Sequence, residues 1–180
     1  MRKTIAIFSM VCVSLALSAV SCRAQEDRSK RPSPPATTAL DLGGGKSITV
    51  DYSSPRAKGR KIYGELIPFG QVWRTGANEA TTFVTTADVT VGGVLVPAGS
   101  YTLFTVPNKD KWTLILSKKT GEWGTDYPGP ANDLARVDMT VSALPAPVEN
   151  FTISFKSSAG GTTLNIDWET TCAAVTIVKN

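Results

Sequence analysis

Hydrophobic and polar residues alternate along most of the chain after residue 40, and this pattern limits how the chain can fold. Because successive side chains of a strand point to opposite faces of a sheet, a period of two predicts strands with one face against a core. Strands are expected over residues 47–52, 81–86, 88–91, 94–96, 101–106, 112–117, 135–141, 151–155, 164–168 and 175–177. Helical periodicity is absent after residue 24. The pattern therefore predicts an all-β protein, an antiparallel β-sandwich or jelly-roll-like barrel of about ten short strands.

Two further features refine this prediction, namely pairs of glycines between strands and strands that are apolar on both faces. Gly92-Gly93 and Gly160-Gly161 each separate two strands, and such pairs suit tight hairpin turns because glycine tolerates positive φ. The strands over 101–106 and 112–117 are apolar on both faces, which predicts central positions in the sheet. Aromatic residues of the later strands are expected in the core, namely Phe151, Phe155 and Trp168.

The first 24 residues have the pattern of an export signal. Arg2-Lys3 forms a positive start, and the apolar run over residues 5–20 is too short to cross a bilayer. A peptidase that cuts near Ser21 or Ala24 would release a soluble periplasmic or secreted protein. The pattern thus predicts export.

A second processing route is open. Residues 19–22 read Ala-Val-Ser-Cys, which is similar to a lipobox in which Cys22 becomes the lipidated first residue, although Ala19 stands where leucine is usual. Acyl chains on Cys22 would anchor the domain to a membrane. We therefore expect either a periplasmic protein or an outer-membrane-anchored lipoprotein, with membrane contact only through Cys22.

The next segment is rich in proline, serine, threonine and charge. Residues 25–39 cannot bury a core and are expected to form a disordered tether, followed by a single domain over residues 40–180. Without residues 1–24 the chain has 16 basic and 15 acidic residues, a formal charge of +1. This balance gives no support for nucleic-acid binding. The basic run over residues 56–61 is expected to be a solvated loop.

The chain contains no histidine, which removes several kinds of active site. Ser-His-Asp catalysis, papain-like catalysis and histidine-ligated zinc or copper are all excluded. Cys172 is the single cysteine after residue 24 and is expected to be a small packed side chain. We predict neither a metal nor a cofactor.

Two segments break the strand pattern, over residues 53–80 and 118–133. Both are long for loops in a compact domain, and loops on a rigid sheet often carry function. The first contains residues 73–79, Trp-Arg-Thr-Gly-Ala-Asn-Glu. If the loops meet, they predict a pocket for a small polar ligand or an envelope glycan. Its candidate binding residues are Trp73, Arg74, Asn78, Glu79, Trp123 and Tyr127.

These motifs resemble the signature of the DUF2911 family of bacterial domains. The resemblance rests on residues 59–64, 68–81 and 97–104, with Trp112-Thr113, Trp123-Gly124 and Tyr127, and spans about residues 45–178. Lys58 departs from it, since arginine is expected there. The resemblance implies export but no particular activity.

Three interpretations of the 73–79 motif are open. The motif can be structural, with Asn78 and Glu79 capping turns, Arg74 paired with Glu79 and Trp73 filling the end of the sheet stack. It can bind a ligand. It can also belong to a glycosidase-like hydrolase in which Glu79 works with a second carboxylate from Glu65, Glu122 or Asp126. We expect a domain without enzymatic activity, because no second carboxylate is specified by spacing.

Overall fold

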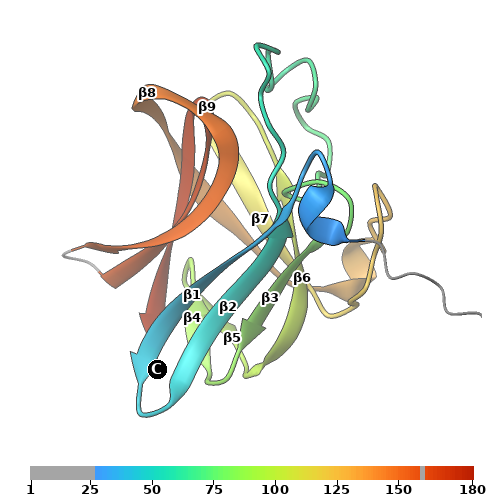
Figure 1. Cartoon of the computed structure of the whole chain (residues 1–180). Coiled ribbons are helices and arrows are strands. Elements are labelled where there is room, and N and C mark those ends of the chain that lie inside the picture. The colour runs from blue at the N-terminus through green and yellow to red at the C-terminus, as the bar shows by residue number, and fades with distance from the viewer. Residues whose placement is uncertain (1–26, 159–160) are drawn as a thin grey trace, which may run out of the picture.

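The computed structural model describes residues 27–158 and 161–180 (Figure 1). The described chain forms one antiparallel sheet of nine strands that is not closed, in a sandwich-like arrangement. The strands are β1 (Pro35–Gly43), β2 (Lys46–Ser53), β3 (Thr81–Thr85), β4 (Val89–Val91), β5 (Val94–Val96), β6 (Gly99–Val106), β7 (Lys111–Ser117), β8 (Asp133–Ser158) and β9 (Gly161–Lys179). Two short 3-10 helices are η1 (Arg28–Lys30) and η2 (Pro130–Asn132). The predicted all-β fold is confirmed.

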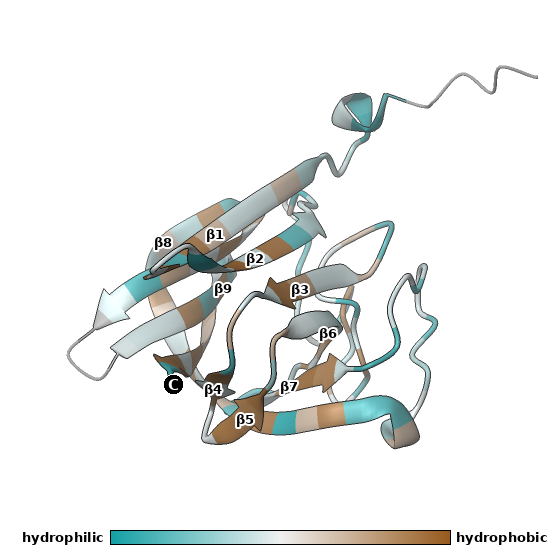
Figure 2. Ribbon diagram, turned by 90° about the horizontal axis from the view of Figure 1, so that it is seen from below, coloured by the Kyte–Doolittle hydropathy of each residue, from teal (hydrophilic) through white to brown (hydrophobic). Residues whose placement is uncertain are grey.

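The strands follow the order β1-β2-β3-β6-β7-β8-β9-β4-β5. The two strands that are apolar on both faces, β6 and β7, lie in the middle of this order, as predicted. The Gly92-Gly93 pair connects β4 to β5, and Val91 faces Val94 across that turn. Figure 2 shows hydrophobic and hydrophilic residues in alternation along β2, where Ile48, Val50 and Tyr52 are buried. The period of two therefore reports the strand faces correctly.

The strand count of the described chain is nine instead of the expected ten because four expected strands merge into two long ones and β1 is an additional strand. Residues 135–141 and 151–155 belong to one strand, β8, and residues 164–168 and 175–177 belong to β9. The β8–β9 ladder has irregular register between Ala143 and Thr152, a segment with two prolines that cannot donate to the ladder. The hairpin bends there and arches over the sheet without interrupting either strand (Figure 1).

The prediction of a disordered tether over residues 25–39 is wrong for its last five residues. Residues 35–39 form the start of β1, where Ala36 faces Tyr52 and Thr38 faces Val50 across the β1–β2 ladder. The β-branched threonines Thr37 and Thr38 favour an extended backbone, and pairing with β2 satisfies the polar groups of that backbone. The export signal and Cys22 lie outside the described residues.

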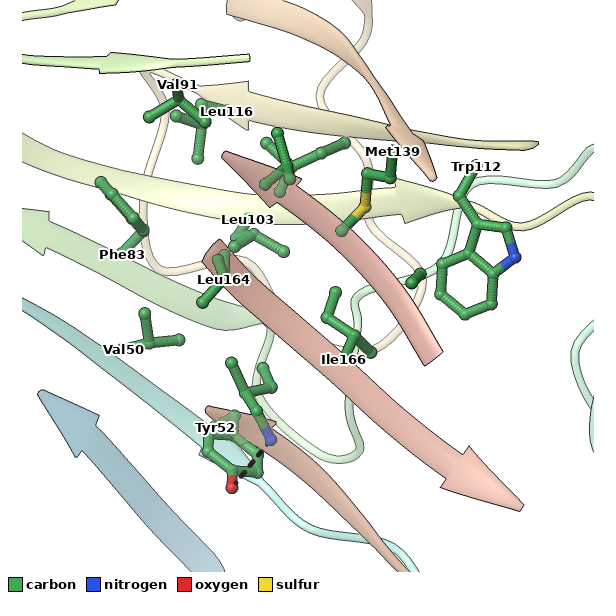
Figure 3. Packing of buried hydrophobic residues seen from close by; sticks show 14 of the residues in the cluster. Val50, Tyr52, Phe83, Val91, Leu103, Trp112, Leu116, Met139, Leu164 and Ile166 are labelled. Atoms are coloured by element: carbon green, nitrogen blue, oxygen red, sulfur yellow. Dashed lines mark hydrogen bonds between the residues drawn. The ribbon is translucent and has the colours of Figure 1, made fainter. Parts of the chain in front are cut away.

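Most buried hydrophobic residues form one large core cluster (Figure 3), and Ala80, Phe104 and Ile115 form a second, small one. Phe151 and Trp168 are each 1% exposed, and Phe155 packs against the same core. The Tyr52 hydroxyl accepts a hydrogen bond of 3.1 Å from the Ile153 backbone N–H, drawn as a dashed line in Figure 3. This bond joins β2 directly to β8, in the bent part of the β8–β9 hairpin, which is called the arch below. No helix within the described ranges is long and apolar enough to span a membrane.

Candidate functional site

Residues 53–80 leave the end of β2 and project beyond the sheet before they return as β3 (Figure 1). The segment is tied to the arch at its start, where the Ala57 N–H donates to the Glu149 carbonyl at 2.9 Å. It is tied to β6 near its end, where Trp73 and Thr105 exchange two backbone hydrogen bonds of 2.7 and 2.9 Å. The segment is therefore irregular in form but held at both ends.

The turn within the 73–79 motif depends on Gly76. A side chain at this position would place its Cβ 2.9 Å from the Ser53 carbonyl oxygen, so only glycine lets the two backbones come this close. Thr75 has a positive φ of 55° and is fully buried. Its hydroxyl lies 3.0 Å from the Thr105 hydroxyl, and its carbonyl accepts a 2.7 Å hydrogen bond from the Thr81 hydroxyl. These contacts satisfy the polar groups of a tight, buried turn.

Trp73 is part of the core. Its side chain is 6% exposed and stacks on Trp168, with ring centroids 6.0 Å apart. It also meets Phe151 edge to face at 5.1 Å, and its indole N–H donates to the Gly76 carbonyl at 3.0 Å. Of the open interpretations, the structural one, with Trp73 packed within the stack of strands, fits this burial. The ring is fixed by the core, and only part of its surface is available.

The two irregular segments meet, as the predicted pocket requires. The Ala80 N–H donates to the Glu122 carbonyl at 3.1 Å, and the Gly124 N–H donates to the Asn78 carbonyl at 3.1 Å. Glu79 and Trp123 form an isolated antiparallel bridge between them. The 118–133 segment is thus attached to the end of the 73–79 motif by backbone hydrogen bonds.

A cavity of about 740 Å³ lies where these segments meet the core. Leu66 lines it and is 42% exposed, so the cavity opens to solvent beside this residue. The apolar part of the lining comes from Pro55, Leu66, Ile67, Pro68, Val72, Trp73, Gly76, Ala77 and Trp168. The polar part comes from Ser33, Arg60, Gln71, Arg74, Thr125 and Tyr127. Among the residues that the structure describes, the lining thus contains two arginines and neither aspartate nor glutamate.

Arg74 is the most unusual polar group of this lining. Its side chain is partly buried, and its Nε atom is buried with no hydrogen-bond partner among the described residues. The expected pairing of Arg74 with Glu79 is absent from the ion pairs of the described chain. Burial lowers the pKa of the Arg74 guanidinium, because a desolvated cation without a counter-ion is costly to hold.

Tyr127 also lines the cavity. Its ring packs edge to face on Phe104 at 5.3 Å, and its hydroxyl donates to Asp133 at 2.8–2.9 Å. The same hydroxyl accepts a 3.2 Å hydrogen bond from Arg136. Burial and the Asp133 carboxylate together raise the pKa of the Tyr127 phenol. Tyr127 is therefore a fixed neutral wall at neutral pH.

Asn78 and Glu79 do not belong to the described lining of this cavity and hold the N-terminal segment of residues 27–34 instead. The Asn78 amide donates to the Ser33 carbonyl at 3.1 Å. Both carboxylate oxygens of Glu79 accept hydrogen bonds from Arg31, at 3.0 and 3.2 Å, and Arg28 forms a second ion pair with the same group. The 27–34 segment is thus docked on the motif by charge and hydrogen bonds.

The hydrogen bonds and ion pairs from Arg31 and Arg28 affect the pKa of Glu79. Partial burial alone would raise it, but a hydrogen bond from its own backbone and the nearby charges of Arg31 and Arg28 outweigh burial and lower it. The carboxylate is therefore ionised and occupied. Sequence reasoning missed Arg28, Arg31 and Ser33 because they lie in the proline-rich segment. The three cations within residues 28–31 were the available signal.

A second, smaller hollow of about 430 Å³ lies on the other side of Glu79. Trp123 lines it and is 54% exposed, and Asp51, Glu79 and Glu122 contribute carboxylates. Glu122 is buried and accepts a 2.6 Å hydrogen bond from the Thr102 hydroxyl. Trp73 and Trp123 therefore line different hollows, and the predicted pocket with two tryptophan walls does not exist as one site.

The remaining candidate carboxylates lie elsewhere. Glu65 is exposed and pairs with Lys61 at 3.1 Å, and Asp126 is exposed. Cys172 is buried and accepts a 3.4 Å hydrogen bond from the Asn165 amide, and burial raises the pKa of its thiol. In residues 27–158 and 161–180, no three metal-ligating side chains lie close enough to hold an ion.

Comparison with known proteins gives one match. The model of the family described as "Protein of unknown function (DUF2911)" matches residues 33–177, from the docked segment beside Asn78 into β9. No curated protein and no solved structure matches the chain. Because the family match covers most of the chain and includes both irregular segments, the protein belongs to the DUF2911 family.

Proposed function

We propose that this domain is an exported binding module that holds a small molecule in the 740 Å³ cavity. The cavity itself carries the proposal. Its volume falls within the range of about 300–1,000 Å³ that small-molecule sites occupy. Its lining is mainly apolar with a few polar groups, which is the usual composition of such sites.

The walls of the cavity support binding without large rearrangement. Trp73 and Trp168 belong to the core, and Tyr127 is held by Phe104 and Asp133. A ligand that enters such a preformed site loses little affinity to ordering of the protein. The apolar lining favours a ligand with a hydrophobic portion over a bare envelope glycan.

Export rests on the first 24 residues. The positive start at Arg2-Lys3 and the short apolar run after it support secretion to the periplasm. The Ala-Val-Ser-Cys sequence supports attachment to the outer membrane through lipid on Cys22. The mass of the mature protein from a bacterial host separates the two routes, because acyl chains on Cys22 add a mass that Cys22→Ser removes.

A hydrolase based on Glu79 has less support. A glycosidase needs a carboxylate that is free to contact the substrate, together with a second one at a defined separation. Glu79 is engaged by Arg31 through both oxygens and by Arg28, and its lowered pKa is the opposite of what a general acid needs. Binding at the larger cavity is therefore the stronger candidate.

An uncharged fluorescent dye tests the binding proposal. N-phenyl-1-naphthylamine brightens in apolar surroundings, and we expect saturable binding to the wild-type protein. Ala77 lines the cavity, so Ala77→Phe should fill part of it and weaken binding. Ala143 is exposed on β8 outside the cavity, and Ala143→Phe is the matched control. Failure of the dye to bind, or equal binding by the two variants, would count against this cavity as the site.

A further inference from the structure

The charge of the cavity identifies the class of its ligand, provided that the cavity binds one as proposed above. Two guanidinium groups, from Arg60 and Arg74, line it, and no acidic residue of the described chain does. The nearby acids Asp51, Glu79 and Glu122 line the separate hollow. The charged groups of the larger cavity's described lining are therefore both positive, although Arg60 also lines a neighbouring hollow with Glu149 and Glu169.

Arg74 differs from the partly buried Arg31 and the exposed Arg136, which both pair with carboxylates, and from the partly buried Arg56, which donates to Ser54. Arg31 has the Glu79 carboxylate, and Arg136 has Asp133 at 2.8 Å. Arg74 forms no ion pair among the described residues, and its buried Nε atom has no hydrogen-bond partner there. Buried charges in proteins are normally paired, because an unpaired one is costly. Arg74 lies beside an open apolar cavity, so an anion bound there would supply the missing counter-ion and hydrogen-bond acceptor.

Arg60 adds a second positive charge with a fixed direction. Its Nε donates to the Ala57 carbonyl at 3.0 Å, and an Nη atom donates to the Arg56 carbonyl at 2.6 Å. Neutral carbonyls orient this guanidinium without cancelling its charge. In the described chain it forms no ion pair with a carboxylate. Neither Arg60 nor Arg74 therefore has a carboxylate partner within the described chain.

We infer that the ligand is an amphipathic anion, with its acidic head on Arg74 and its apolar body against Leu66, Pro68 and Val72, the more exposed apolar residues of the lining. The planar donor fork of arginine suits a carboxylate, which it can bind through two hydrogen bonds. The aliphatic wall suits a ring or a short hydrocarbon chain. A small organic acid with a hydrophobic body matches both parts of the lining.

Two dyes that share their aromatic rings test this inference. Anilinonaphthalene sulfonate carries an anionic head, and N-phenyl-1-naphthylamine has the same rings without it. The wild-type protein should bind the anionic dye more tightly than the neutral one. Arg74→Gln should weaken binding of the anionic dye about 10- to 100-fold, the range for a hydrogen bond to a charged group. Binding of the neutral dye should change by less than about twofold.

Lys111→Gln is the control for loss of positive charge. Lys111 is exposed, pairs with Asp138 and lies outside the cavity, so its loss should leave the affinity for both dyes unchanged. Raising the salt concentration should weaken binding of the anionic dye to the wild-type protein and spare the neutral dye. This measurement needs no variant and holds even if Arg74→Gln fails to fold.

The outcomes separate this inference from the function it rests on. Equal affinity of the wild-type protein for both dyes, or equal losses for both in Arg74→Gln, would overturn the anionic ligand and leave a neutral-ligand cavity. Salt-independent binding of the anionic dye would overturn it as well. If neither dye bound to the wild-type protein, the cavity itself would be rejected as a binding site.

Discussion

The ion pairs of Glu79 predict that the N-terminal segment contributes to the stability of the domain. In Glu79→Ala, Arg31 loses a carboxylate that accepts two hydrogen bonds, and Arg28 loses its ion pair. The Arg31 side chain is only 16% exposed, so water replaces the lost contact incompletely, whereas the Arg28 side chain is 51% exposed. We expect Arg31 to account for most of the loss.

The size of the effect follows from these exposures. A hydrogen bond to a charged group contributes about 1.5–3 kcal/mol, and an exposed ion pair contributes about 0–1 kcal/mol. Glu79→Ala should therefore lower the free energy of unfolding by about 2–3 kcal/mol. For a domain of this size, that corresponds to a fall of about 4–12 °C in the midpoint of thermal unfolding.

Calorimetry of a double-mutant cycle tests the assignment. The free energy of coupling between Glu79 and Arg31 should be about 1.5–3 kcal/mol, and that between Glu79 and Arg28 below about 1 kcal/mol. Arg28→Ala is thus the matched control, since it removes a cation from the same carboxylate at a more exposed position. An unchanged midpoint in Glu79→Ala, together with negligible coupling to Arg31, would refute a stabilising role for the docked segment.

Three further predictions concern the same motif. The lowered pKa of Glu79 means that its contribution to stability is present above the ordinary value of 4.5 and is lost as pH falls through the folded-state pKa; the difference in unfolding free energy between wild type and Glu79→Gln should therefore shrink on acidification below 4.5, and a constant difference would contradict this. Trp73→Ala should cost about 3–5 kcal/mol in chemical denaturation, whereas Trp123→Ala, at a position 54% exposed, should cost less than about 1 kcal/mol; equal losses would contradict the different placement of the two rings. Gly76→Ala should destabilise by about 1–3 kcal/mol because its Cβ would lie 2.9 Å from the Ser53 carbonyl oxygen, and an unchanged unfolding midpoint would show that the turn can relax.

Much of the sheet could be predicted because strand faces are a local property. Val50 and Tyr52 alternate with polar neighbours and both point into the core. The missed features are non-local. The continuity of β8 through its proline-containing bend depends on pairing with β9, and the strand over residues 35–39 depends on β2 as a partner. A single-sequence pattern carries neither fact.

The features of the candidate site also fall into a local group, which could be predicted, and a non-local group, which could not. The all-β class, the two irregular segments and the unusual content of the 73–79 motif could be predicted from the sequence, because composition and periodicity act over a few residues. Tertiary structure alone decided that Trp73 stacks in the core and that Glu79 holds Arg31. It also left Arg74 beside an apolar cavity without a carboxylate partner in the described chain. Such roles depend on which distant groups arrive next to each side chain, and only the folded arrangement of strands and loops sets that.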